Sequence, residues 1–366
     1  MDRRSFLKTT AAAPAAVVVS GLPHLASGNP ATAGPSRVFE VTTRIEVLKP
    51  AGVTRVWLPA PLIRDTDYFK SLGSSWKAEG GTVALVQEAK YGAGIVSAEF
   101  PPSVGKPVLQ LTSRFSTRDR IVDLSKPPAG AKEDPAILKL SLEPTALIPT
   151  DGIVRDTARE ITKGQRSNIR KARAIYEWVV ENTFRDPKVR GCGWGDIKTM
   201  LETRNFGGKC GDLNAMFVGL ARSVGVPARD VYGVRVAKSQ NGYLSLGTNT
   251  EVISKAQHCR AEFYGEGYGW IPVDPADVRK VALEEPPGKL AITDEKVKKA
   301  RAMLFGYWEM NWLAYNYAHD VPLPGSKGPK IPYFMYPNGE TAEGRLDQLE
   351  PETFKYTMTS RELTSA

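Results

Sequence analysis

The chain has 366 residues, a formal net charge of +9, and 42% hydrophobic residues, which is enough to build two domains with a core each. The positive charge is not gathered in a dense lysine and arginine block or in a basic stripe with interleaved aromatic residues, so a nucleic-acid partner is not predicted. After the first residues no apolar run approaches 18, which predicts no stable membrane span.

The N-terminal segment is typical of an export signal. A twin-arginine pair at 3–4 is followed by a mildly apolar, alanine-rich stretch at 11–22, and small residues that suit cleavage lie at 26–33. We therefore interpret 1–33 as a twin-arginine signal peptide. It predicts a bacterial protein that is exported folded and works in the periplasm or another extracytoplasmic space.

The next region is predicted to be a small antiparallel β-sandwich domain over 37–124. Its segments 37–48 and 108–124 alternate apolar and polar residues, which is the pattern of half-buried strands, and turns with proline and glycine separate them. The proline-rich passage at 125–150 is expected to be a linker that runs over the surface.

The apolar residues then change to helical spacing. One stripe predicts a helix over 167–184, and a second stripe at 213–224 predicts another helix, which the glycine and proline at 225–227 end. We assign both helices to a catalytic domain at 151–293. The remaining residues, 294–366, form an aromatic-rich C-terminal extension that we expect to pack on this core.

Cys210 lies between a glycine-rich turn and the start of the second helix. Unpaired backbone N–H groups and the positive end of the helix dipole stabilise an anion there, which lowers a thiol pKa and supplies donors for an oxyanion. Gly207, Gly208 and Gly211 would let a substrate backbone approach closely. Cys210 is therefore a candidate nucleophile, and a small buried cysteine behind a glycine turn is the alternative.

The candidate base is His258, which begins a segment that alternates in the manner of a strand. Because His258 and Cys259 point to opposite faces, Cys259 is predicted to lie in the core. The glycine-rich stretch at 265–269 predicts a hairpin, and the returning strand ends at Asp274.

The hairpin places the acid close to the histidine in either of two registers. Folding about Glu266 sets Asp274 opposite His258, and folding about Gly267 sets it opposite Arg260 and diagonal to His258. Both registers put the two side chains on one face. This is the geometry of a thiol–imidazole–carboxylate relay, in which the carboxylate fixes the tautomer and orientation of the ring.

The three cysteines, Cys192, Cys210 and Cys259, contain no CxxC pair, and their odd number leaves at least one thiol free. A disulfide between Cys192 and Cys259 and burial of Cys192 in the core both stay open. Zinc held by the three cysteines and His258 is disfavoured, because neighbouring strand residues point to opposite faces, so no metal and no cofactor are predicted. His319 has no strand pattern around it and is the weaker candidate base.

Three blocks in order resemble the transglutaminase-like superfamily. They are "GGKCGDLNAMFVGLARSVGVPAR", "QHCRAEFY" and "GYGWIPVDPAD", and the resemblance covers roughly 167–277. It implies a papain-like α+β core with Cys210 as nucleophile, His258 as general base and acid, and Asp274 as the residue that orients the histidine. In animal members a tryptophan upstream of the cysteine helps hold the oxyanion, which makes Trp194 a candidate here beside the backbone N–H of Cys210.

The resemblance implies thiolate attack on a carboxamide or peptide carbonyl, giving a thioester on Cys210 that an amine or water resolves. An amine gives transglutamination, and water gives the activity of a cysteine protease or cell-wall amidase. The expected substrate is a peptide or protein amide, such as a cell-envelope component. A non-catalytic envelope-binding module is the alternative from another class. The sequence shows no calcium loop of the D-x-[DN]-x-[DN]-G type, which predicts calcium independence.

Overall fold

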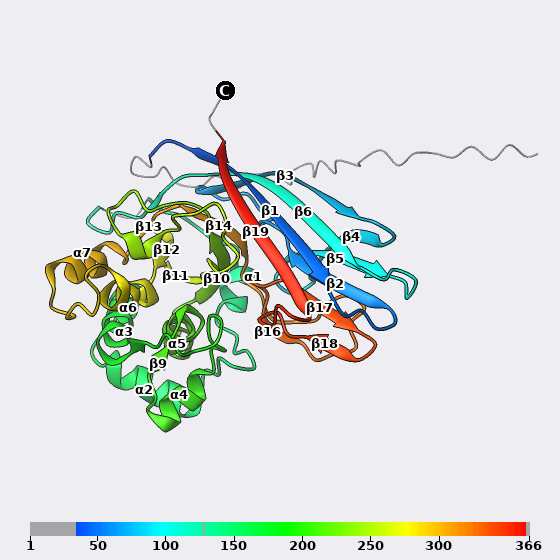
Figure 1. The fold of residues 1–366 in the computed structure, drawn as a ribbon. Helices are drawn as coiled ribbons and strands as arrows, with labels where there is room; N and C mark the ends of the chain where they lie inside the picture. The colour runs from blue at the N-terminus through cyan, green and yellow to red at the C-terminus, as the bar shows by residue number, and fades with distance from the viewer. Residues whose placement is uncertain (1–33, 127–128, 364–366) are drawn as a thin grey trace, which may run out of the picture.

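The computed structural model describes residues 34–126 and 129–363, so the predicted signal peptide at 1–33 lies outside the described residues. Two halves lie side by side in Figure 1: a sandwich of long strands, and a group of helices with a smaller sheet. The predicted α+β architecture, with an antiparallel β-sandwich beside a core of helices and a smaller sheet, is confirmed.

The sandwich consists of two antiparallel sheets. The first has the order β19 (Phe354–Leu363), β1 (Arg37–Val47), β6 (Val108–Thr117) and β3 (Phe69–Ala78). The second has the order β18 (Gly344–Leu346), β17 (Asn338–Thr341), β2 (Thr54–Pro59), β5 (Gly94–Phe100) and β4 (Thr82–Gln87). Inward-facing side chains such as Ile45, Val56 and Leu111 fill the space between the sheets, as the alternation in β1 and β6 predicts.

The C-terminal extension is not confined to the helical core. The strand β19 pairs with β1 along its whole length, and β17 pairs with β2, so both sheets of the sandwich contain strands from the end of the chain. Figure 1 shows the red β19 beside the blue β1. Phe354 of β19 packs in the sandwich core with Ile45. The region 37–124 therefore supplies most of the sandwich, and the residues after 337 complete it.

The other half is built on a central antiparallel sheet. Its order is β12 (Gly269–Val273), β11 (Arg260–Gly265), β10 (Ala228–Arg235) and β14 (Trp312–Asn316). One face packs on helix α5 (Cys210–Ser223), and the other face packs on the sandwich, where Val231 and Trp312 share a core cluster with Phe39 and Phe115. Because both faces are covered, every residue of β11 is buried even though its sequence alternates.

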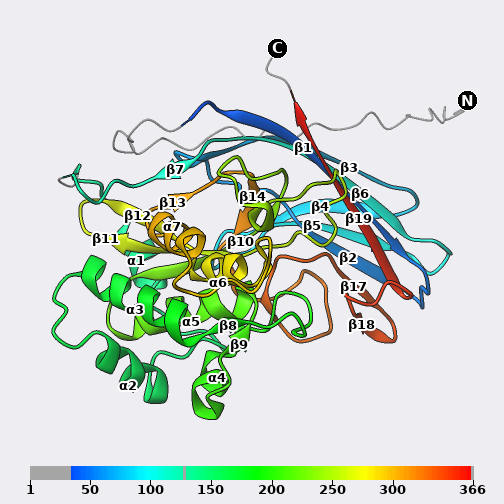
Figure 2. The same cartoon turned by 60° about the vertical axis from the view of Figure 1, so that its left-hand side comes forward.

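Most of the helices lie on the side of this sheet away from the long strands of the sandwich (Figure 2). The helices are α1 (Pro135–Leu140), α2 (Gly152–Ile161), α3 (Asn168–Asn182), α4 (Ile197–Thr203), α6 (Pro275–Glu284), α7 (Glu295–Met303) and the short η1 (Leu244–Leu246). The short strand pairs are β7 (Arg120–Ile121) with β13 (Tyr307–Trp308), β15 (His319–Val321) with β16 (Ile331–Tyr333), and β8 (Phe184–Arg185) with β9 (Gly207–Gly208). Within the described residues, none of the helices has the length and apolar character that crossing a membrane requires.

Both predicted helices are present, and the second is more deeply buried than its pattern indicates. The hydroxyl of Ser167 accepts a hydrogen bond from the backbone N–H of Arg170 and caps α3. Helix α5 lies between the central sheet and α2 and α3, so its polar residues need partners inside the protein. Arg222, for example, donates from Nε to the carbonyl of Ala228 over 2.7 Å. The segment expected as a linker also contributes, because Ile148 packs in the core beside α5.

A buried ion triad joins the sandwich side to the central sheet. Glu262 of β11 accepts hydrogen bonds from Arg120 of β7 and from Arg229 of β10. Burial opposes the charge on Glu262, but the two guanidinium groups outweigh it and hold its pKa below the usual range. Arg229 also lies 3.8 Å from the ring centroids of Trp270 and Tyr317. The triad therefore fixes β11, the strand that follows His258, against the rest of the molecule.

Replacing this carboxylate is expected to destabilise the fold. Glu262→Gln should lower the free energy of unfolding by about 3–5 kcal/mol, because it leaves buried guanidinium groups without their counter-charge. Denaturant unfolding followed by tryptophan fluorescence measures the change. Glu202→Gln is the control, because Glu202 pairs with Lys198 on the exposed face of α4, and its unfolding midpoint should not move. Equal shifts in both variants would contradict the triad's role.

Candidate active site

Cys210 lies where the sequence predicts a helix N-terminus. It is the first residue of α5, directly after the cap residue Lys209, and its side chain is buried at 3% exposure. The backbone N–H of Lys209 donates to the Asp212 carboxylate over 2.9 Å and closes the first turn. As the first helical residue, Cys210 has a backbone N–H without a partner inside the helix, so this N–H is a candidate oxyanion donor.

The segment between β8 and α4 packs closely on the first turn of α5. The backbone N–H of Gly211 donates to the carbonyl of Cys192 over 2.8 Å, and a Cβ added at Gly211 would lie 2.6 Å from that oxygen. Gly193 has a φ of +88°, and a Cβ there would lie 1.8 Å from the Asp212 carboxylate. At Gly211 the space that we assigned to a substrate backbone is therefore filled by the protein's own chain.

The C-terminal extension holds this segment in place. The hydroxyl of Tyr333 donates to the carbonyl of Gly193 over 2.6 Å, and the hydroxyl of Tyr336 donates to the sulfur of Cys192 over 3.0 Å. Part of the extension thus packs on the core beside the nucleophile candidate, while its later strands belong to the sandwich.

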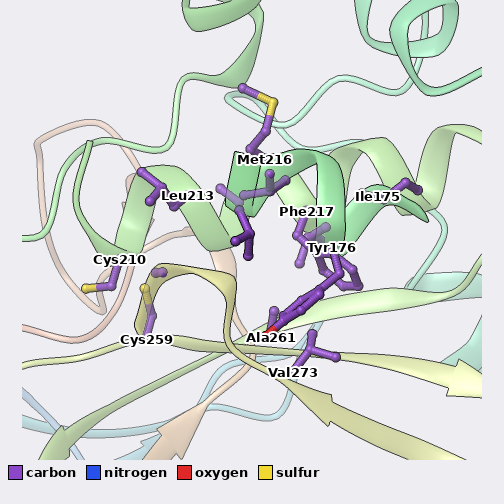
Figure 3. Close-up of a cluster of buried hydrophobic side chains, with 14 of the residues drawn as sticks. Ile175, Tyr176, Cys210, Leu213, Met216, Phe217, Cys259, Ala261 and Val273 are labelled. Atoms are coloured by element: carbon purple, nitrogen blue, oxygen red, sulfur yellow. The ribbon is translucent and has the colours of Figure 1, made fainter. Parts of the chain in front are cut away.

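Three free thiols meet at the start of α5. Cys192, Cys210 and Cys259 are all buried and unbonded, so the disulfide left open by the sequence is not formed. Cys259 lies in the core as predicted, and Figure 3 shows it beside Cys210. Hydrogen bonding from Cys192, then from Cys259 and from His258, holds the pKa of Cys210 well below its usual value. Burial and the contact with Cys210 raise the pKa of Cys259, and the same contact raises that of Cys192.

The predicted hairpin brings the acid to the histidine. Strands β11 and β12 pair in the register centred on Gly267, which sets Asp274 level with Arg260 and diagonal to His258. His258 itself lies two residues before β11, although it was expected to begin the strand. Its Nε2 lies 2.7 Å from Oδ2 of Asp274 and donates to it, so Nδ1 is the ring nitrogen left free to take a proton from a thiol.

Two further polar residues, which the sequence patterns did not indicate, fix Asp274. Asp274 caps α6, and its Oδ1 accepts from the backbone N–H of Asp277 over 3.0 Å and from Nδ2 of Asn214 over 3.2 Å. Asn214 also donates to the carbonyl of Cys259 over 2.8 Å. It lies one turn after Cys210 on α5, so it connects this helix to the segment that carries His258. Asn214 lies within an apolar stripe of the sequence, so the sequence pattern did not indicate this role.

The charges around the imidazole favour its protonated form. Burial and Arg235 oppose a charge on His258, but Asp277 and Asp274 outweigh them and raise its pKa to about 9. The lowered pKa of Cys210 and the raised pKa of His258 both favour a thiolate–imidazolium pair over a neutral thiol and imidazole. This is the ionic state in which a cysteine is most ready to attack a carbonyl carbon.

Trp194 lies at the surface. Its side chain is 70% exposed, and it lines a groove of about 200 Å³ together with Gly207 and Asp212, which flank Cys210 in the sequence. The groove therefore runs beside the first turn of α5. The role of Trp194 at the oxyanion stays a prediction.

His319 has other partners. Its Nε2 lies 3.3 Å from Oδ2 of Asp230, and its Nδ1 lies 3.4 Å from the hydroxyl of Tyr232. His258 is the histidine that helps to lower the pKa of the Cys210 thiol.

Among residues 34–126 and 129–363, the ligand-type side chains near enough to share one metal ion are His258, Asp274 and Asp277. Arg235 pairs with Asp277, and Nε of Arg260 lies 3.8 Å from Asp274. The positive charge that these carboxylates need is therefore supplied by the protein.

Comparison with known families matches two parts of the chain, the predicted catalytic core and the predicted signal peptide. Residues 155–275 match the transglutaminase-like superfamily, and residues 1–20 match the signal sequence of the twin-arginine translocation pathway. The predicted twin-arginine export is thus confirmed.

Whole-chain comparisons extend the match beyond the core. An uncharacterised protein of Haemophilus influenzae is 33% identical over 346 residues, which cover 90% of this chain and 92% of that protein. A crystal structure of a proposed cysteine protease from Cytophaga hutchinsonii has a TM-score of 0.50 and 15% identity over 90% of this chain and 99% of that chain, which shows a shared fold. The periplasmic domain of TgpA from Pseudomonas aeruginosa matches 69% of this chain and 93% of that chain at 14% identity, with a TM-score of only 0.32.

Alkylation tests the thiolate directly. Iodoacetamide is expected to modify Cys210 well below pH ~8.5, the range of an ordinary thiol, while Cys192 and Cys259 stay unmodified because their pKa values are raised. Mass mapping after labelling across about pH 4–9 identifies the modified residue. His258→Gln should move the rise in rate to higher pH, because the stabilising imidazolium is lost. Labelling in mild urea controls for restricted access, and modification of Cys192 or Cys259 ahead of Cys210 would contradict the assignment.

Proposed function

This chain belongs to the transglutaminase-like superfamily, and we propose that it cleaves amide bonds in the cell envelope by acyl transfer to Cys210. The observation that carries the proposal is the buried pair of His258 and Asp274, whose Nε2 and Oδ2 lie 2.7 Å apart, together with Cys210 at the N-terminus of α5, where His258 helps to lower the thiol pKa. The twin-arginine signal supports a site of action outside the cytoplasm, and we place it in the periplasm.

The first half of the reaction uses the thiolate–imidazolium pair. The Cys210 thiolate attacks the amide carbonyl, and the resulting oxyanion accepts a hydrogen bond from the backbone N–H of Cys210 at the N-terminus of α5. His258 then gives its proton to the leaving ammonia or amine. The products of this half are a thioester on Cys210 and a neutral His258, which Asp274 keeps in the tautomer that can accept a proton at Nδ1.

The second half restores the thiolate. A primary amine or a water molecule attacks the thioester carbonyl and gives its proton to His258, and the Cys210 sulfur leaves as thiolate. Attack by an amine makes a new amide, which is transglutaminase activity. Attack by water makes a carboxylate, which is the activity of a protease or amidase.

The groove beside Trp194 supports a peptide or protein substrate. It is open along the first turn of α5, and an exposed indole at its rim gives an extended chain a flat apolar surface. The three residues that we assign to catalysis are themselves buried, and we take this groove, which reaches Gly207 and Asp212 on either side of Cys210 in the sequence, as the approach for a side-chain amide.

Trapping the thioester tests the proposed function. The protein is incubated with casein and a fluorescent primary amine, quenched in acid and digested, and the Cys210 peptide is searched for an acyl adduct by mass spectrometry. His258→Gln should slow adduct formation by about 100-fold or more. His319→Gln is the matched control, because both histidines are 4% exposed, and it should leave the rate unchanged. Fluorescent casein indicates amine transfer, and deamidated or cleaved casein without label indicates hydrolysis. Equal loss of adduct in both variants would contradict the assignment of His258.

Activity is expected to be independent of calcium. The chain has no acidic loop of the type that binds calcium in helix–loop–helix sites, and the charges at the site are balanced by arginine residues. Turnover measured with and without a chelator should agree within error. A sharp loss in chelator, restored by calcium, would be contrary evidence.

A further inference from the structure

Two carboxylates, not one, lie at Nε2 of His258. Oδ2 of Asp274 is 2.7 Å away, and Oδ1 of Asp277 is 3.4 Å away. All three side chains are buried, with exposures of 4%, 0% and 1% for His258, Asp274 and Asp277. A single carboxylate would be enough to fix the tautomer, so the second one requires its own explanation.

Asp277 is held rigidly from the other side. Nη2 of Arg235 lies 2.6 Å from Oδ1 and 2.7 Å from Oδ2 of Asp277, and Nη1 of Arg235 donates to the carbonyl of Leu246 over 2.6 Å. A guanidinium in this position fixes the orientation of the carboxylate, which cannot rotate away from the imidazole without breaking both bonds.

The N-terminus of α6 and the neighbouring arginine residues stabilise the two buried carboxylates. Asp274 is the cap of α6 and Asp277 lies in its first turn, where backbone N–H groups and the helix dipole stabilise negative charge. The charged and titratable groups packed around the imidazole come from every surrounding element: Cys210 from α5, Arg235 from β10, Arg260 from β11, and Asp274 and Asp277 from α6.

We propose that Asp277, held in place by Arg235, is a second positioning carboxylate for His258. It stabilises the His258 imidazolium when the Cys210 sulfur carries no negative charge. The inference rests on the proposed function. In the acyl-enzyme the Cys210 sulfur is neutral, so the proton that His258 takes from water or an amine in the second half of the reaction faces only Asp274 and Asp277 as counter-charges. Asp277 therefore contributes most to resolving the thioester.

The test is an NMR titration of the two histidines in the exported protein. The chain has three histidines and His24 lies in the leader, so only His258 and His319 contribute signals, and His319→Gln assigns them. In the unmodified protein His258 should titrate near pH 9. Asp277→Asn should lower this value by about one unit or more, because a counter-charge is lost and Arg235 is left to repel the imidazolium.

A matched variant separates this effect from a general loss of structure. Asp230 lies 3.3 Å from His319, as Asp277 lies 3.4 Å from His258, and Asp230→Asn should leave the His258 titration in place. If Asp277→Asn does not fold because Arg235 has lost its partner, the comparison is made in an Arg235→Gln background, where the added Asp277→Asn should again lower the His258 value. An unchanged His258 titration in the folded variants would overturn the proposal.

Kinetics distinguish failure of this inference from failure of the proposed function. Asp277→Asn is expected to slow decay of the thioester more than its formation, measured as the fraction of acylated Cys210 at steady state. Equal slowing of both steps would overturn the assignment to the second half of the reaction. If the unmodified protein shows neither an acyl adduct nor a reactive Cys210, the proposed function fails, whereas a normal adduct with an unmoved His258 titration removes only the role of Asp277.

Discussion

Two helix N-termini meet at one imidazole, and the candidate site depends on this arrangement. Helix α5 begins at Cys210 and α6 begins directly after Asp274, so the positive ends of both helices face groups that carry negative charge. His258 lies between them, and Arg235 and Arg260 supply the remaining positive charge. Burying any one of these charges alone would cost several kcal/mol, so the set is stable only when all members are present and paired.

The layers around the site keep these charges in position. The central sheet is covered by α5 on one face and by the sandwich on the other, and the triad at Glu262 links β11 to β7 and to the neighbouring strand β10. The C-terminal extension completes the sandwich with β19. Its Tyr336 also donates a hydrogen bond to Cys192 and so holds the segment between β8 and α4 in place. Parts of the chain that are distant in sequence thus meet around the start of α5.

The location of the candidate site could be predicted because its geometry is largely local. The hairpin register and the alternation of side chains place Asp274 on the face of His258, and the apolar stripe of α5 places Cys210 at a helix N-terminus. The residues that tune the site could not be predicted in this way. Asn214 lies within an apolar stripe, and Asp277 resembles an ordinary first-turn acid of a helix, so neither has a distinguishing pattern.

The sequence by itself determined the export signal, the two helices, the hairpin and the family, because each depends on residues within a few turns of one another. Only the tertiary structure decided which charges share one buried space. Arg235 and Asp277 lie 42 residues apart, and β19 pairs with β1 from the opposite end of the chain. Such pairings follow from the packing of layers, and periodicity along a chain carries no information about which distant element will cover a given face.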